Sequence, residues 1–214
     1  VYKRQNHFLL SRLWLDEENI NFFKKYILHE ETLRKSIQEN INEYKDSGIK
    51  IVIERAKLMS IAPGGAMSAI LGLDEKIIED VCNELTNEMA GSVEIGNYNT
   101  PLQSVISGNI EEVTEAEIKL KDAGAKKTIR LNVSVASHSK LMKDASNKFE
   151  EFISKFEFMM PKYPIIQNVD LSILETTEGL VDRLVKQICG TVRWRESLIK
   201  MADGYGVKNF FEIN

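Results

Sequence analysis

The run Ala66-Met67-Ser68-Ala69-Ile70-Leu71 decides the fold, because a compact apolar stretch of this length is typical of a buried strand. Asp74 follows it closely and is a residue type that caps the start of a helix. Apolar side chains then recur at helical spacing, which predicts an amphipathic helix. The positions on its apolar face are Ile77, Ile78, Val81, Cys82 and Leu85.

Further strand patterns and one more helix complete this region. Residues 93–97 and 103–107 predict short strands, and the turn signal Asn99-Thr100-Pro101-Leu102 separates them. A helix then extends to Gly124, where a glycine favours helix termination, and residues 129–135 alternate as a strand does. The region therefore predicts the order strand, helix, strand, strand, helix, strand, which is the split βαβ or ferredoxin-like unit.

The flanking regions predict a larger α/β domain around this unit. Upstream, residues 8–46 have the spacing of one or two amphipathic helices, and residues 51–59 predict a helix that Ala62-Pro63-Gly64-Gly65 stops. Downstream, helices and strands alternate, which favours a parallel sheet covered by helices. The predicted downstream elements are helices over 141–154, 178–189 and 193–202 and strands over 165–169 and 207–213.

The composition is that of an ordinary globular protein. The 214 residues are 43% apolar and 28% charged with a formal net charge of −4, which excludes collagen-like, low-complexity and largely disordered chains. A mildly acidic chain has no global field that attracts nucleic acid, and no apolar run approaches the roughly 18 residues of a membrane span. Cys82 and Cys189 predict buried free thiols, and the three separated histidines offer no zinc site. We therefore expect a soluble, cytoplasmic, metal-free protein without a nucleic-acid or membrane partner.

A series of short sequence blocks keeps one order and spacing over residues 49–214. These blocks are Ile51-Val52-Ile53-Glu54-Arg55-Ala56-Lys57-Leu58-Met59-Ser60, Gly65-Ala66-Met67-Ser68-Ala69-Ile70-Leu71-Gly72-Leu73, Asn97-Tyr98-Asn99-Thr100-Pro101 with Gln103, Val105-Ile106-Ser107-Gly108, Ala123-Gly124-Ala125-Lys126-Lys127, Ser137-His138-Ser139-Lys140-Leu141-Met142-Lys143, Asn168-Val169-Asp170, Leu184-Val185-Lys186-Gln187 and Val192-Arg193-Trp194. Together they resemble the malonyl-CoA:acyl-carrier-protein transacylase family.

This resemblance implies a fold and a reaction. The implied fold is α/β, a partial α/β-hydrolase-like acyltransferase core with an inserted ferredoxin-like (βαββαβ) subdomain. Residues 49–63 and 137–214 then belong to the core, residues 64–136 form the subdomain, and residues 1–48 are an unmatched helical segment. The implied reaction of fatty-acid biosynthesis transfers malonyl from malonyl-CoA to the phosphopantetheine thiol of an acyl carrier protein. Its ping-pong route passes through an acyl-serine and needs no cofactor beyond the malonyl-CoA substrate.

The chain departs from the family at the nucleophile. The family's serine lies in a Gly-His-Ser-x-Gly segment, whereas no Gly-x-Ser-x-Gly occurs in this chain. Leu28-His29-Glu30-Glu31 stands at roughly the corresponding place. We therefore interpret the chain as an N-terminally incomplete or rearranged copy that is inactive as given. The alternative is a non-catalytic paralogue that binds malonyl-CoA or acyl carrier protein.

His138 and Gln187 are the catalytic candidates. An imidazole titrates near neutral pH, so it can take a proton from a serine and return it to a leaving thiolate. The resemblance implies that the carbonyl of Gln187 accepts a hydrogen bond from this imidazole, in the role that a carboxylate has in the usual triad. The alternatives are a loop histidine that caps the next helix and a surface glutamine.

Arg55 is the first substrate-binding candidate, because a planar guanidinium holds a carboxylate with two parallel hydrogen bonds. The resemblance implies that it grips the free carboxylate of malonyl, and the alternative is a helix-surface arginine paired with Glu54 or another acid. Asn97, Asn99 and Gln103 flank the predicted turn and are candidates for hydrogen bonds to substrate or coenzyme A amides. Asparagine at turns is equally a backbone device.

Two further surfaces are weighed from the sequence. A local basic cluster would steer an acidic carrier protein, or it is simply a solvated helix face. RNA binding through the ferredoxin-like unit is disfavoured, because residues 93–97 and 103–107 lack the stacking aromatics that this mode uses. The basic cluster consists of Lys119, Lys121, Lys126, Lys127 and Arg130.

Overall fold

The computed structural model describes residues 47–161, 163–174 and 176–210. Asp46–Leu198 forms one compact unit, and 199–210 belongs to a second. The helices expected over 8–46 and the segment 28–31 lie outside the described residues. No helix in the described part is long and apolar enough to cross a membrane.

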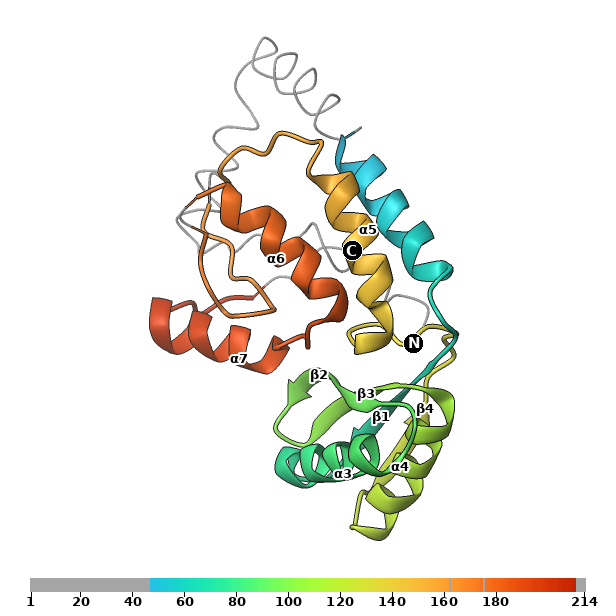
Figure 1. Cartoon of the computed structure of the whole chain (residues 1–214). Coiled ribbons are helices and arrows are strands. Elements are labelled where there is room, and N and C mark those ends of the chain that lie inside the picture. The colour runs from blue at the N-terminus through green and yellow to red at the C-terminus, as the bar shows by residue number, and fades with distance from the viewer. Residues whose placement is uncertain (1–46, 162, 175, 211–214) are drawn as a thin grey trace. The chain divides into compact units, whose positions relative to one another are not determined.

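A four-stranded antiparallel sheet with two helices forms the first half of the larger unit (Figure 1). The sheet order is β2-β3-β1-β4, and each neighbouring pair is antiparallel. The chain passes through it in the order β1, α3, β2, β3, α4, β4, as the sequence predicts. The elements are β1 (Ala66–Leu71), α3 (Glu75–Glu88), β2 (Val93–Thr100), β3 (Gln103–Gly108), α4 (Ile110–Asp122) and β4 (Lys127–Arg130).

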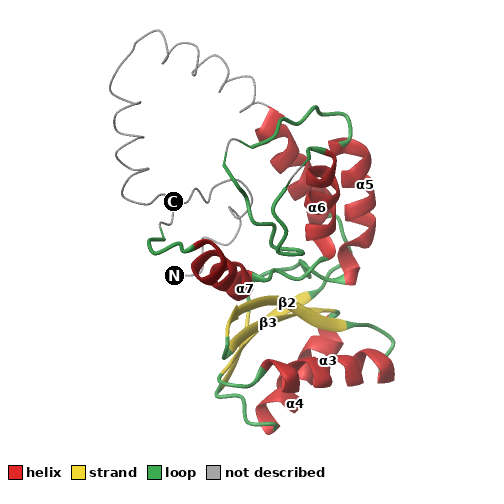
Figure 2. Ribbon diagram, turned by 90° about the vertical axis from the view of Figure 1, so that its left-hand side faces the viewer, coloured by secondary structure: helices red, strands yellow, loops and turns green. Residues whose placement is uncertain are grey.

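The alternation of side chains along β1 gives the sheet two different faces. Ala66 and Ile70 point into a core with α3 and α4, which cover one face of the sheet (Figure 2). Met67 and Ala69 point to the opposite face, where they pack with Val105 of β3. Because strand side chains alternate with a period of two, this run of apolar residues serves both faces.

Local capping chemistry fixes the helix boundaries in this half. The Asp74 carboxylate accepts a hydrogen bond from the Lys76 amide at 2.9 Å, so α3 begins at Glu75 as expected. Gly124 has a φ of 104°, the left-handed conformation that a glycine supplies after a helix. The turn between β2 and β3 is confined to Pro101 and Leu102.

The rest of this unit consists of helices joined by irregular segments in the described residues. A helix over residues 47–60 packs with α5 and α6 around a second core that contains Met59, Phe149 and Ile188. The other elements are η2 (Lys140–Met142), α5 (Lys143–Ile153), α6 (Glu178–Cys189) and α7 (Trp194–Ile199). In the second unit the structure describes the π-helix η3 (Lys200–Gly204).

The structure corrects several strand predictions. The strand predicted over 129–135 ends at Arg130. Leu131 still donates a backbone hydrogen bond to Met67, but Val135 makes only an isolated bridge to Gly64. The prediction of a strand over 165–169 is wrong, because Ile166 makes only a single bridge to Ile173.

The predicted last strand is also absent where it is described, since residues 207–210 form no strand and 211–213 lie outside the described residues. A parallel sheet is likewise not found among the described residues. The parallel pairing found there is an isolated bridge between Asn97 and Val192. A strand needs a neighbouring strand to bond with, and among the described residues these segments make no pairing beyond isolated bridges.

Candidate active site

The loop after the sheet brings His138 onto α6. The His138 amide donates to the carbonyl of Ile188 at 3.1 Å, and the Ser107 hydroxyl on β3 donates to the carbonyl of Ser137 at 2.7 Å. These two bonds attach the loop to α6 on one side and to the sheet face opposite α3 and α4 on the other. His138 therefore stands at the junction of the two cores.

The His138 side chain is held by carbonyl oxygens. Its Nδ1 lies 2.9 Å from the main-chain oxygen of Gln187 and 3.1 Å from that of Gly190. A carbonyl oxygen only accepts hydrogen bonds, so Nδ1 carries the hydrogen and Nε2 of the neutral ring presents its lone pair. This is the tautomer that a general base at Nε2 requires.

The backbone at His138 supports a functional assignment. Its φ is 61°, in the left-handed region that a residue with a side chain seldom adopts. Conformations of this kind cost about 1–3 kcal/mol and persist where surrounding contacts impose them. Here the bonds of the His138 amide and ring impose the conformation together.

Burial and charge lower the pKa of His138 to about 4, with burial as the larger cause and the positive charge of Arg55 as the second. The bonds to Gln187 and Gly190 act in the opposite direction. At neutral pH the imidazole is therefore uncharged and able to accept a proton.

Arg55 lies on the buried side of the helix over 47–60, on the same side as Ile51 and Met59, which pack into the second core. Its Nε is buried without a hydrogen-bond partner, and burial lowers its pKa to about 10, so the guanidinium stays charged at neutral pH. Glu54 pairs instead with Lys57 at 3.6 Å, so the expected alternative partner is not used.

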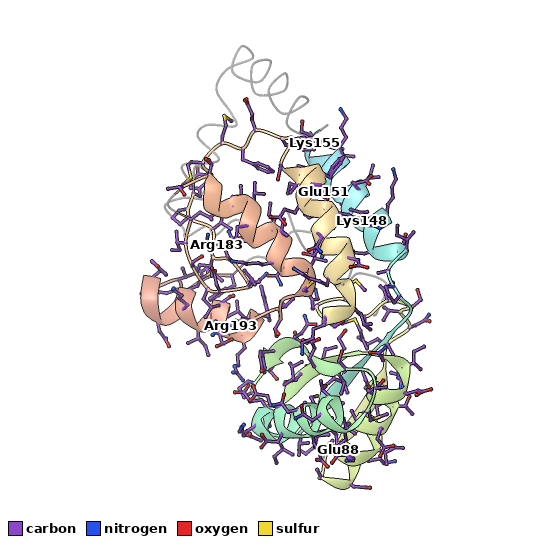
Figure 3. All side chains as sticks on the ribbon, viewed as in Figure 1. Glu88, Lys148, Glu151, Lys155, Arg183 and Arg193 are labelled. Carbon is purple, nitrogen blue, oxygen red and sulfur yellow. The ribbon has the colours of Figure 1, made fainter. Side chains whose placement is uncertain are left out.

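Arg55 differs in this respect from the other arginines in the described part of the chain. Arg183 and Arg193, both labelled in Figure 3, pair with Asp170 and Glu196. Arg130 pairs with Glu117 and Arg195 with Glu75. A buried guanidinium without a carboxylate partner is a ready site for an anionic ligand.

Gln187 reaches the site in an unexpected way. The side chain is buried, and its amide Nε2 donates to the Gly190 carbonyl at 2.9 Å. The oxygen that meets the imidazole belongs to the main chain of the same residue. Gln187 thus contributes to the site twice, once directly and once by bonding the second carbonyl that His138 contacts.

The three amide candidates lie apart from one another. Asn97 and Asn99 are half-buried within β2 rather than in a turn, and Asn97 bridges to Val192. Gln103 starts β3, four residues from Ser107 and so about 13 Å along the strand from the His138 loop. The structure brings Asn97 near the site and leaves Gln103 at the far end of the sheet.

The site also contains two glycines that the sequence did not predict. Gly190 supplies a carbonyl to His138. At Gly96 a Cβ would come within 3.6 Å of the His138 Cβ and 3.2 Å of the Ser107 Cβ, so a larger residue would crowd the loop. The position of Gly190 directly after a predicted helix was the available signal.

The basic cluster is partly neutralised. Lys119 pairs with Glu84 at 2.8 Å, and Arg130 pairs with Glu117 at 2.7 Å.

The described residues hold no group of His, Cys, Asp and Glu side chains that could bind a metal ion. Cys82 and Cys189 are free thiols.

Known proteins are similar to this chain in sequence and in fold. A malonyl CoA-acyl carrier protein transacylase of Escherichia coli (strain K12) is 37% identical over 168 residues, which are 77% of this chain and 53% of that protein. One of Bacillus subtilis (strain 168) is 35% identical over 173 residues, 79% of this chain and 54% of that protein. The matched residues belong to the malonyl CoA-acyl carrier protein transacylase family. No family model matches the chain.

The solved structures agree with this assignment. A malonyl-transacylase in complex with its type II polyketide synthase acyl-carrier protein has a TM-score of 0.70 at 37% identity, covering 75% of this chain and 52% of that chain. The chain therefore has the α/β architecture of the transacylase family and spans about half the length of the relatives that it matches.

Proposed function

We propose that this chain carries the general base and the carboxylate-binding arginine of an acyltransferase that moves malonyl from malonyl-CoA to the phosphopantetheine thiol of an acyl carrier protein, a step of fatty-acid biosynthesis. One observation carries this proposal. His138 is fixed as the Nδ1–H tautomer in the same site as Arg55, whose buried Nε has no hydrogen-bond partner among the described residues. The family membership supports it.

In the proposed chemistry the two residues have separate tasks. Arg55 binds the free carboxylate of the malonyl group and so selects dicarboxylic thioesters. Nε2 of His138 takes the proton of a nucleophilic hydroxyl as it attacks the thioester, and returns that proton to the departing coenzyme A sulfur. The second half-reaction reverses these transfers with the carrier-protein thiol, and no cofactor takes part.

We further propose that residues 64–136 are a ferredoxin-like subdomain inserted into an acyltransferase core formed by 49–63 and 137–214. The antiparallel order β2-β3-β1-β4 supports this division. Asn97 and Asn99, on the β2 edge, remain candidates for contacts with the substrate amides, and Gln103 is the weakest of the three because of its distance from His138.

The chain as printed is expected to bind malonyl-CoA without forming a malonyl-enzyme. It contains no Gly-x-Ser-x-Gly segment, and loss of a triad nucleophile costs on the order of 10⁶ in rate in other enzymes. Mass spectrometry after incubation with malonyl-CoA tests this, with an intact relative as the positive control. A stable added malonyl group on this chain would refute the expectation.

Binding of malonyl-CoA tests the role of Arg55. Calorimetric titration of Arg55→Gln is expected to show affinity reduced at least about tenfold, the scale of one lost charge-assisted hydrogen bond. Lys57→Gln is the matched control, since it removes one positive charge from the exposed side of the same helix. Acetyl-CoA, which lacks the carboxylate, should bind all three proteins alike. Equal malonyl-CoA affinity in Arg55→Gln and the unmodified chain would overturn the proposal.

A further inference from the structure

The segment from Gly190 to Arg193 adds to the edge of β2 next to His138. The Val192 amide donates to the Gly96 carbonyl at 2.8 Å, and the Tyr98 amide donates to the Val192 carbonyl at 2.9 Å. The Thr191 hydroxyl donates to the Ile95 carbonyl at 2.8 Å. The segment that begins with Gly190 therefore runs parallel to β2 and is held against its edge.

The carbonyl of Gly190 is the point where this segment meets the imidazole. It accepts from His138 Nδ1 at 3.1 Å and from the Gln187 side chain at 2.9 Å. If the carbonyl moved away, Nδ1 would keep only the Gln187 oxygen, and the preference for the Nδ1–H tautomer would weaken. The position of the segment therefore bears on the protonation state of the base.

Arg195 fixes the other end of the segment. Its guanidinium donates to both oxygens of Glu75, at 2.6 and 3.2 Å, and Glu75 stands on the first turn of α3. The same guanidinium lies over the Tyr98 ring, 5.9 Å from the ring centre, and the Tyr98 hydroxyl donates to Glu79. The Arg195 side chain is 19% exposed and that of Glu75 35% exposed, so the pair is shielded from water better than a surface ion pair.

Tyr98 links the two sets of contacts. Its main-chain amide bonds the segment at Val192, and its ring contacts Arg195 three residues later. The segment is thus held at its middle by β2 and at its end by a side-chain clamp made of Arg195, Glu75, Tyr98 and Glu79. Among the described residues, none of these four forms a hydrogen bond with His138.

We propose that Arg195 is a positioning residue for the base: its clamp on Glu75 and Tyr98 holds the 190–193 segment on β2, and the segment in turn holds the Gly190 carbonyl against Nδ1 of His138. The assignment of His138 as a base rests on the proposed function. The geometric link from Arg195 to the imidazole stands whether or not the chain binds malonyl-CoA.

The test is ¹⁵N NMR of the His138 ring in the full chain, without substrate. Arg195→Lys keeps the positive charge but loses the two-pronged contact with Glu75. It is expected to change His138 from the Nδ1–H tautomer to a mixture, and to move the titration midpoint below its value near 4, because the Gly190 carbonyl bond is one of the contacts that raise the pKa of His138. Arg130→Lys is the matched control, because Arg130, on β4 and away from the segment, makes the same kind of two-pronged contact with Glu117 of α4. It should leave both readouts unchanged.

A double variant with exchanged charges distinguishes a positioning role of Arg195 from a simple folding defect. Arg195→Glu combined with Glu75→Arg restores an ion pair, so it should return the tautomer and the midpoint part of the way to those of the unmodified chain. An unaltered His138 ring in Arg195→Lys would overturn the proposal, and so would an equal change in Arg130→Lys. Because the readout needs no malonyl-CoA, failure of malonyl-CoA binding to depend on Arg55 would reject the proposed function alone.

Discussion

The sheet half and the helical half of the larger unit treat their polar groups differently. Around the sheet, the buried carboxylate of Glu112 accepts from the Gly91 amide, and the Thr86 hydroxyl bonds Val93. In the helical half the buried Nε of Arg55 has no partner, and burial holds His138 uncharged. Among the described residues the sheet half also buries an unpartnered hydroxyl, that of Ser68, but this group is neutral, whereas the helical half buries an unpartnered charged group that an anionic ligand could bind.

Their apolar surfaces are more alike, since both halves expose apolar side chains on their helices, as Ile110 and Ile118 of α4 do in the sheet half. The core between the sheet and its two helices is continuous, with Ile70, Ile106 and Leu120 fully buried. The helix over 47–60 buries one side and leaves Ile49 and Ile53 exposed on the other. The candidate site is therefore marked by the unpartnered charge at Arg55 rather than by the extent of apolar exposure.

The largest expected effect breaks the helical core and spares the sheet. Phe149 is 1% exposed on α5, so Phe149→Ala should lower the free energy of unfolding by about 3–5 kcal/mol. Hydrogen exchange should show lost protection in α5 and α6 with protection retained in β1 and β3. Lys148→Ala, at an exposed neighbouring position (Figure 3), should change stability by less than about 0.5 kcal/mol. Uniform loss of protection would show that the two cores unfold as one.

The next effect is a pH dependence located in the helical half. The unfolded chain binds a proton at His138 near pH 6.5, and the folded chain does so only near pH 4. Stability is therefore full above pH 6.5 and falls as the pH decreases toward 4, by at most about 3 kcal/mol and less where water reaches the ring.

Urea unfolding across this range, compared with His138→Asn, measures that contribution. Asparagine tolerates the left-handed backbone and does not titrate, so the variant should lack this part of the acid sensitivity. A His138→Asn protein with the same pH profile as the unmodified chain would show that His138 is not held uncharged.

A smaller effect couples the two site residues. A carboxylate bound to Arg55 would offset the charge that lowers the pKa of His138, so malonate should raise the NMR titration midpoint of His138 above 4. The rise should be about one pH unit or less, because burial is the larger cause and remains. Malonamide, a neutral ligand of the same size, is the control. A midpoint unaffected by saturating malonate would separate the anion site from the base.

The smallest expected effect concerns the sheet half. Asp74→Ala removes the side-chain cap of α3 and should cost about 1 kcal/mol of stability in urea unfolding. Asp74→Asn keeps an acceptor and should cost only a few tenths. A loss in Asp74→Asn as large as in Asp74→Ala would mean that the charge, rather than the hydrogen bond, matters at this position.

The elements of the sheet half could be predicted because local signals and long-range pairing agree there. The Asp74 cap, the Gly124 stop and the compact apolar run 66–71 each mark a boundary that the structure reproduces. Residues 165–169 failed because β-rich composition does not supply a neighbouring strand. The short β4 shows the same limit, since alternation continues to Val135 but most of its pairing with β1 ends at Arg130.

The site could be predicted as a set of residue types but not as a set of contacts. Sequence named Arg55, His138 and Gln187, whose roles remain proposals. It did not show that Gln187 meets the imidazole through its main chain, because a backbone carbonyl leaves no trace in residue identity. Residue identity likewise did not show that Gly190 contributes its carbonyl, or that Nε of Arg55 has no hydrogen-bond partner among the described residues.

The 190–193 segment has a consequence for self-association. By pairing with β2 it occupies one border of the sheet, and the other border, β4, is short and exposes Lys127 and Arg130. An incoming strand from a second molecule would find part of the β2 edge already paired with the segment, and at β4 an edge of only four residues that carries the exposed cation of Lys127. The sheet is thereby protected from templating fibril growth.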